Sequence, residues 1–94
     1  MSEHEKFNAQ MEEQLKAMKA KLDDAKTTAE TKGRDFFARY EKDLAKLESK
    51  YDLARYKLTL LRKGGQSAWG EVKSGFERAY HDLREALNKA SNKF

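Results

Sequence analysis

Apolar residues recur at every third or fourth position over most of the first 61 residues of this chain. The series begins at Phe7. Its part from Leu15 to Leu61, with Gly33 counted as one position, covers 46 residues in 13 steps. A mean step of about 3.5 residues is typical of a coiled coil, in which one apolar stripe faces another helix. The sequence has no proline and no cysteine, so no proline interrupts a helix and no disulfide shapes the fold. The pattern predicts an all-α protein.

A second amphipathic segment follows the glycine pair. Its apolar positions are again three or four residues apart, which predicts a helix over about 67–93. The members of this face are Trp69, Val72, Phe76, Ala79 or Tyr80, Leu83, Leu87 and Ala90.

The segment between the two helices is expected to form a turn over about 63–66. Gly64 is predicted to take the left-handed conformation that ends many helices, and Ser67 is a candidate N-cap. Trp69 is expected to pack beside the turn, where an aromatic ring can bury a large area. The predicted hairpin-turn residues are Gly64, Gly65, Ser67 and Trp69.

The same glycines could also belong to a phosphate-binding loop. The stretch from Gly65 to Gly70 matches G-x-x-x-x-G. A P-loop continues with Lys and then Ser or Thr, which contact the phosphates and magnesium. This sequence has Glu71 and Val72 at those positions and no preceding strand, so we expect a structural turn and no cofactor.

Two architectures remain possible because of Gly33. The favoured one is an antiparallel helical hairpin with a long first helix over about 3–62, since the apolar stripe crosses Gly33 in phase. One internal glycine costs a helix only about 1 kcal/mol relative to alanine. The alternative is a three-helix bundle with a break near Gly33, which would give three segments of similar length. Both describe a single helical domain over 1–94.

The two architectures differ in what they leave uncovered. In the hairpin, the shorter second helix covers only part of the first, so the N-terminal arm has no partner in its own chain. A stripe of that length is not left in water, so we expect a homodimer or another helical protein as partner. The three-helix bundle predicts a self-sufficient monomer. The predicted association stripe consists of Phe7, Met11, Leu15, Met18 and Leu22.

Two further groups of residues are candidates for contact surfaces. Phe36 and Phe37 are adjacent, so one of them points off the main stripe. Together with Tyr40 they form either a partner surface or a wider core stripe at a three-helix contact. The net charge is +4, and residues 53–70 contain four basic side chains and no acid. This basic cluster is Arg55, Lys57, Arg62 and Lys63.

The sequence offers little support for catalysis or metal binding. His81 and Glu85 lie four residues apart, but two ligands do not make a metal site. No histidine is placed beside a nucleophile, and a thin coiled coil encloses no pocket. We therefore expect no catalytic residues, no metal and no small-molecule substrate. The first ten residues contain no apolar run, so we expect no secretory signal and a cytoplasmic protein.

The second segment carries a family resemblance. The stretch SAWGEVKSGFERAYHDLREALNKASNKF, residues 67–94, begins with Ala-Trp-x-Glu-x-Lys-x-Gly and continues with aromatic, leucine and alanine positions on one face. It resembles a stress-response family of small bacterial coiled-coil proteins. The resemblance implies a helical hairpin and a link to stress, and it implies no known reaction.

These observations predict a non-enzymatic structural or interaction protein, a coiled-coil module that self-associates or binds a helical partner. Two alternatives use the basic turn. In the first, the helix over 67–93 lies on anionic lipid. In the second, the basic cluster binds nucleic acid, which is unlike the long basic stripe of most nucleic-acid binders.

Overall fold

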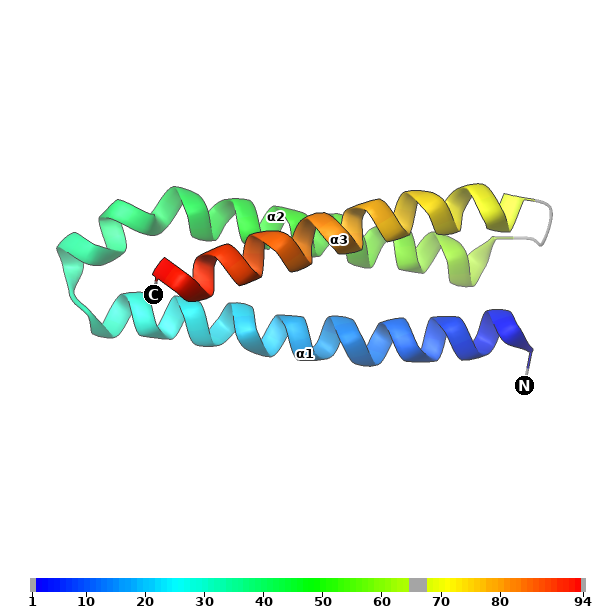
Figure 1. Ribbon diagram of the computed structural model, residues 1–94, viewed down its shortest axis with the longest axis horizontal. Coiled ribbons are helices and arrows are strands. Elements are labelled where there is room, and N and C mark those ends of the chain that lie inside the picture. Colours follow the sequence, from blue (N-terminus) through cyan, green and yellow to red (C-terminus); the bar gives the residue numbers. More distant parts are fainter. Residues whose placement is uncertain (1, 65–67, 94) are drawn as a thin grey trace.

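The computed structural model describes residues 2–64 and 68–93, which form three antiparallel helices (Figure 1). Helix α1 spans Glu3–Thr31, α2 spans Arg34–Lys63 and α3 spans Trp69–Lys93. The molecule measures 50 × 20 × 18 Å. The all-α prediction is confirmed. The favoured hairpin with one continuous helix over about 3–62 is wrong, and the three-helix alternative describes the arrangement.

The break between α1 and α2 is made by Gly33. Its φ of 111° lies in a region that side chains disfavour, and it is the only positive φ among the described residues. The Lys32 N–H donates to the Thr28 carbonyl at 3.1 Å and the Gly33 N–H to the Glu30 carbonyl at 3.3 Å, so these amides stay paired. The chain therefore reverses within two residues of the end of α1.

Burial of the N-terminal arm explains why the chain breaks here. The reversal lays α1 against α2, and Leu15, Met18 and Leu22 become buried within their own chain. Burying one such side chain stabilises a fold by about 1.5–3 kcal/mol. Three of them outweigh the few helical hydrogen bonds lost at one break, at about 0.5–1.5 kcal/mol each. An in-phase stripe is compatible with both outcomes, so phase could not choose between them.

The end of α2 also differs from the prediction. Gly64 has φ −76° and ψ 153°, an extended backbone rather than the predicted left-handed one. Its N–H donates to the Leu60 carbonyl oxygen at 2.8 Å, and a Cβ at this position would lie 2.9 Å from that oxygen. Glycine is therefore needed for close approach and not for a positive φ. The predicted turn residues Gly65 and Ser67 lie outside the described residues.

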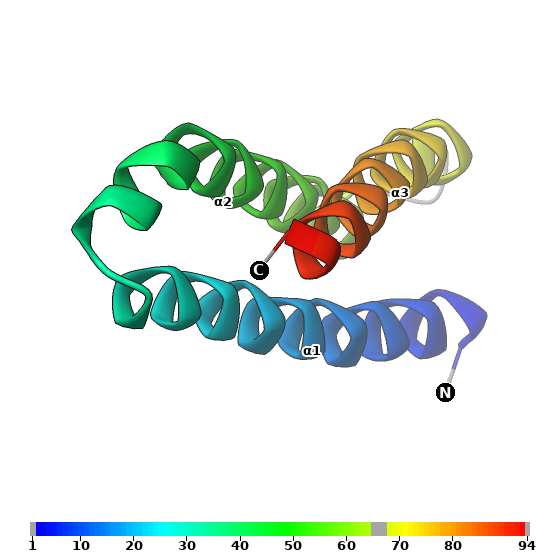
Figure 2. The same cartoon turned by 60° about the vertical axis from the view of Figure 1, so that its left-hand side comes forward.

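All three helices contribute to one hydrophobic core. Helix α2 packs extensively on both neighbours, whereas α1 and α3 contact each other less. Figure 2 shows the three helices from another side, with α1 below α2 and α3. None of the three helices, as far as the chain is described, is long and apolar enough to cross a bilayer. The buried residues are Leu15, Met18, Leu22, Ala29, Leu44, Leu47, Ala54, Leu58, Leu61, Phe76, Ala79, Leu83, Leu87 and Ala90.

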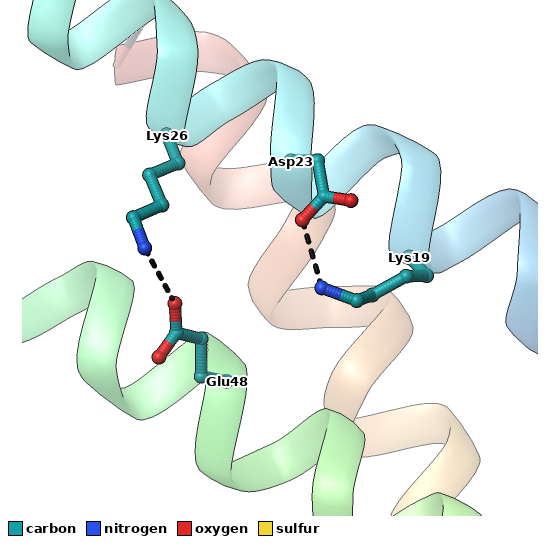
Figure 3. Close-up of polar contacts among 4 residues, drawn as sticks. All are labelled: Lys19, Asp23, Lys26 and Glu48. Carbon is teal, nitrogen blue, oxygen red and sulfur yellow. Dashed lines mark hydrogen bonds and ion pairs between the residues drawn. The ribbon is translucent and has the colours of Figure 1, made fainter.

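Exposed ion pairs lie on the helix surfaces around this core. Figure 3 shows Lys26 of α1 facing Glu48 of α2 at 3.6 Å, and the pair Lys19–Asp23 within α1 at 2.8 Å. The hydrogen bond that the Lys19 Nζ donates to the Asp23 carboxylate raises the pKa of Lys19. Exposed pairs of this kind contribute about 0–1 kcal/mol, so apolar packing rather than charge holds the helices together.

Candidate interaction surfaces

The polar and charged residues that the structure describes lie at least partly at the surface. No polar or charged residue among them is buried. No group of three or more His, Asp or Glu side chains in residues 2–64 and 68–93 is placed to hold a metal ion. His81 and Glu85 are both exposed on α3. The surfaces of the bundle are therefore the places to look for function.

The predicted association stripe lies inside the bundle. Leu15 is 0% exposed and Leu22 is 2% exposed, and Met18 is buried beside them. Phe7 and Met11 are partly buried against the same core. Helices α2 and α3 of the same chain cover this stripe, so it is not left in water.

Aromatic rings fill the end of the bundle where α1 and α3 begin. We call this the closed end and define it by His4, Phe7, Trp69 and Phe76. The His4 ring stacks on Trp69 with centroids 3.8 Å apart, and Phe7 packs edge-on against both Trp69 and Phe76 at 5.6 and 6.0 Å. The Lys73 Nζ lies 5.3 Å from the centroid of the Trp69 ring, a cation–π distance. The closed end thus joins α1 to α3 through ring contacts.

The sequence anticipated part of this arrangement. Trp69 was expected beside the turn, and it stands at the first residue of α3. The stack with His4 was missed, because His4 lies 65 positions away in the sequence. The Trp69 Nε1 is buried and has no hydrogen-bond partner among the described residues.

In the described part of the chain, two helices cover the opposite end of the bundle. We call it the open end and define it by Phe36, Phe37 and Tyr40. The last described residue of α3, Lys93, pairs with Asp43 of α2 at 3.3 Å, so α3 stops level with Asp43. The first turns of α2 extend beyond that point together with the end of α1 (Figure 1). Phe36 and Phe37 are only partly buried there, both against the core.

Local contacts organise the open end. The Phe36 and Tyr40 rings lie 4.7 Å apart, one turn from each other on α2. The Lys32 Nζ lies 4.9 Å from the Phe36 centroid. Both phenylalanines therefore act as a wider core stripe on one side and remain accessible on the other. Their partial burial agrees with a wider core stripe, although at a contact of two helices and not three, and the partner surface stays a prediction.

The predicted basic cluster does not form one patch. Arg62 pairs with Glu12 of α1, so it lies on the α1 side of α2. Lys57 reaches toward α3, because a Cβ on Gly75 would lie 3.3 Å from the Lys57 Nζ. Arg55 and Lys63 are exposed. Helix α2 thus separates these charges instead of gathering them at the turn.

Between those charges runs an exposed apolar ridge that the sequence interpretation missed. Leu53 is 48%, Tyr56 60% and Leu60 39% exposed, and these are the large apolar side chains classed as exposed in residues 2–64 and 68–93. Their spacing of three and four residues places them on one side of α2, away from the core. That spacing was visible in the sequence, but the stronger stripe through Ala54, Leu58 and Leu61 dominated the pattern.

The chain matches no family model, no curated protein and no solved structure. The resemblance of residues 67–94 to the stress-response family therefore stays a prediction. Function has to be argued from the surfaces described above.

Proposed function

We propose that the protein is a non-enzymatic interaction module that self-associates through its open end. The observation that supports this is the difference in helix length at that end. Helices α1 and α2 continue past the last described residue of α3, and they present Phe36, Phe37 and Tyr40 where a third helix would otherwise lie. A second copy can supply that cover.

The chemistry of the open end suits a protein contact. Aromatic residues are enriched at the centres of interfaces, where they bury large areas with few rotatable bonds. A two-fold dimer places the same patch on both sides, so Phe36 and Phe37 of one copy would meet those of the other. The rings are already partly ordered by the core and by the contact between Phe36 and Tyr40, which lowers the entropy lost on association.

Molar mass in solution tests this proposal. Light scattering coupled to size exclusion should give a mass that rises with concentration from 10.9 kDa toward twice that value. Phe37→Ser should keep the protein monomeric while its helical circular dichroism is retained. Tyr56→Ser is the matched control, since it removes an exposed aromatic ring elsewhere on α2. A monomer at every concentration would show that the proposal is wrong.

The alternatives based on the basic turn have less support. The apolar face of α3 is used by the core, where Phe76, Leu83 and Leu87 are buried, so this face is not free to lie on lipid. The basic cluster is divided between two sides of α2, which weakens the case for nucleic acid. The link to stress is tested by measuring whether protein levels rise under heat, salt, metal or oxidative challenge.

A further inference from the structure

The outer face of α2 combines two features that sequence periodicity alone did not connect. The first is the apolar ridge of Leu53, Tyr56 and Leu60. The second is a set of lysines around it. On a helix with 100° between residues, Lys46 falls in line with the ridge, Lys50 and Lys57 fall on its α3 side, and Lys63 falls on its other side.

These lysines are not neutralised by the rest of the bundle. No carboxylate of the described residues lies within ion-pairing distance of Lys46, Lys50, Lys57 or Lys63. Glu48, two residues from both Lys46 and Lys50, pairs with Lys26 on the α1 side. Asp52 lies at the margin of the face. Asp43 lines the α2–α3 groove with Lys46 and Lys50, but it pairs with Lys93. The face is therefore basic with an apolar centre.

The shape of this face favours a flat surface as its partner. The ridge stands out from the helix and extends over two turns, about 10 Å, which is too short to pair with a long partner helix. It offers one aromatic ring, whereas single-stranded nucleic acid is bound by several rings on which successive bases stack. A leucine–tyrosine ridge between lysines matches the interface of an anionic bilayer. There, apolar side chains enter the headgroup region and lysines reach the lipid charges.

We propose that the outer face of α2 docks the folded bundle on anionic lipid bilayers. Leu53, Tyr56 and Leu60 enter the headgroup layer, and the four lysines contact the lipid phosphates. The Lys57 side chain, which reaches toward Gly75 of α3 in the free bundle, turns outward to do so. This site differs from the helix over 67–93 predicted from sequence, because α3 keeps its apolar face in the core. It is also independent of the open end, so each proposal can fail without the other.

Vesicle co-sedimentation tests the proposal. The full chain should bind vesicles of phosphatidylcholine with about 30% phosphatidylglycerol at low salt, bind pure phosphatidylcholine weakly, and be released when salt screens the charges. Replacing two lysines, Lys46→Gln with Lys57→Gln, should lower the partition constant about 25-fold, at about fivefold for each lysine. Tyr56→Ser should lower it several-fold at unchanged charge.

Matched variants distinguish binding through the outer face of α2 from nonspecific electrostatic attraction between the protein and the vesicle. Lys16→Gln with Lys21→Gln removes the same charge from α1 and should change binding less than about twofold, because these residues lie far from the bilayer. At protein concentrations at which the wild type is monomeric, Phe37→Ser should bind vesicles as the wild type does. Trp69, the single tryptophan, should keep its emission on binding, since the closed end stays folded.

Three results would overturn the proposal. One is equal binding to neutral and anionic vesicles. The second is an equal loss in the α1 lysine variant. The third is a blue shift of Trp69 emission with loss of the bundle's stability, which would mean that α3 opens onto the lipid. The protein could also fail to bind vesicles and bind a single-stranded oligonucleotide in a way that Tyr56→Ser weakens. That result would show that the outer face of α2 binds nucleic acid and not lipid.

Discussion

The two ends of this bundle contain similar aromatic side chains in different surroundings. At the closed end, Phe76 is 0% exposed and touches rings from both α1 and α3. At the open end, Phe36 and Phe37 are only partly buried, because the described part of α3 stops level with Asp43. The same residue type is core at one end and accessible at the other.

The difference shows that the number of covering helices decides the role of an aromatic residue. Three helices enclose a ring on all sides, and two helices leave one side to water. An aromatic ring with one side exposed to solvent contributes less to the stability of the fold, and it remains available for binding. Stability should therefore depend on the closed end, and association on the open end.

The largest expected effect comes from truncating one phenylalanine at each end. Phe76→Ala should destabilise the monomer by about 3–5 kcal/mol, because it removes a fully buried ring and leaves a cavity. Phe36→Ala should cost clearly less, about 1–2 kcal/mol, since part of that ring is already in water. Urea unfolding followed by circular dichroism measures both.

The Phe76→Ala variant needs a milder counterpart. Small domains have about 5–15 kcal/mol of stability, so Phe76→Ala can leave the chain partly unfolded even without urea. Phe76→Leu keeps most of the apolar volume and serves as a milder variant that should retain the fold. If the changes at Phe36 and Phe76 cost the same, the two ends are equally covered and the distinction fails.

Sequence periodicity predicted the helical segments, but it did not predict how the helices are arranged. The apolar stripes identified which residues of α1, α2 and α3 face the core, since Leu15, Leu58 and Leu83 all lie on them and are buried. The end of α2 near residue 63 was also visible, because two adjacent glycines break a helix more surely than one.

The remaining features depended on information that periodicity does not hold. The chain reverses at Gly33 because this lays α2 and α3 over the apolar stripe of α1. An apolar pattern that stays in phase across Gly33 does not indicate whether the chain reverses there. The stack of His4 on Trp69 needs the ends of α1 and α3 to meet. The exposure of Leu53, Tyr56 and Leu60 is known only once the side of α2 that faces its neighbours is known.

The second prediction concerns the turn beside the open end. Gly33→Ala places a side chain at φ 111°, which should cost about 1–3 kcal/mol of monomer stability. Gly70→Ala is the matched control. A Cβ there meets nothing within 4 Å, so this helical position should gain up to about 1 kcal/mol. Thermal and urea unfolding at low protein concentration compare the two.

We expect Gly33→Ala to change the oligomeric state as well as the stability. Because the apolar stripe crosses Gly33 in phase, alanine favours one continuous helix, and the freed α1 would then pack on another copy, a domain swap. Phe37→Ser is added to both variants to remove the open-end contact. In that background, light scattering should detect the swapped dimer for Gly33→Ala and only a monomer for Gly70→Ala. A strictly monomeric Gly33→Ala protein with unchanged stability would show that the turn tolerates a side chain.

The smallest expected effects come from the ion pairs toward each end. Glu12→Gln breaks the pair with Arg62 near the closed end, and Asp43→Asn breaks the pair with Lys93 at the limit of α3. All four side chains are at least 40% exposed, so water already screens them. Each change should cost no more than about 0.5 kcal/mol, which lowers Tm by about 2–4 °C and becomes smaller at high salt. A loss above about 1 kcal/mol for Asp43→Asn alone would mean that the Lys93 contact fixes where α3 ends, and that the open end is set by charge rather than by helix length.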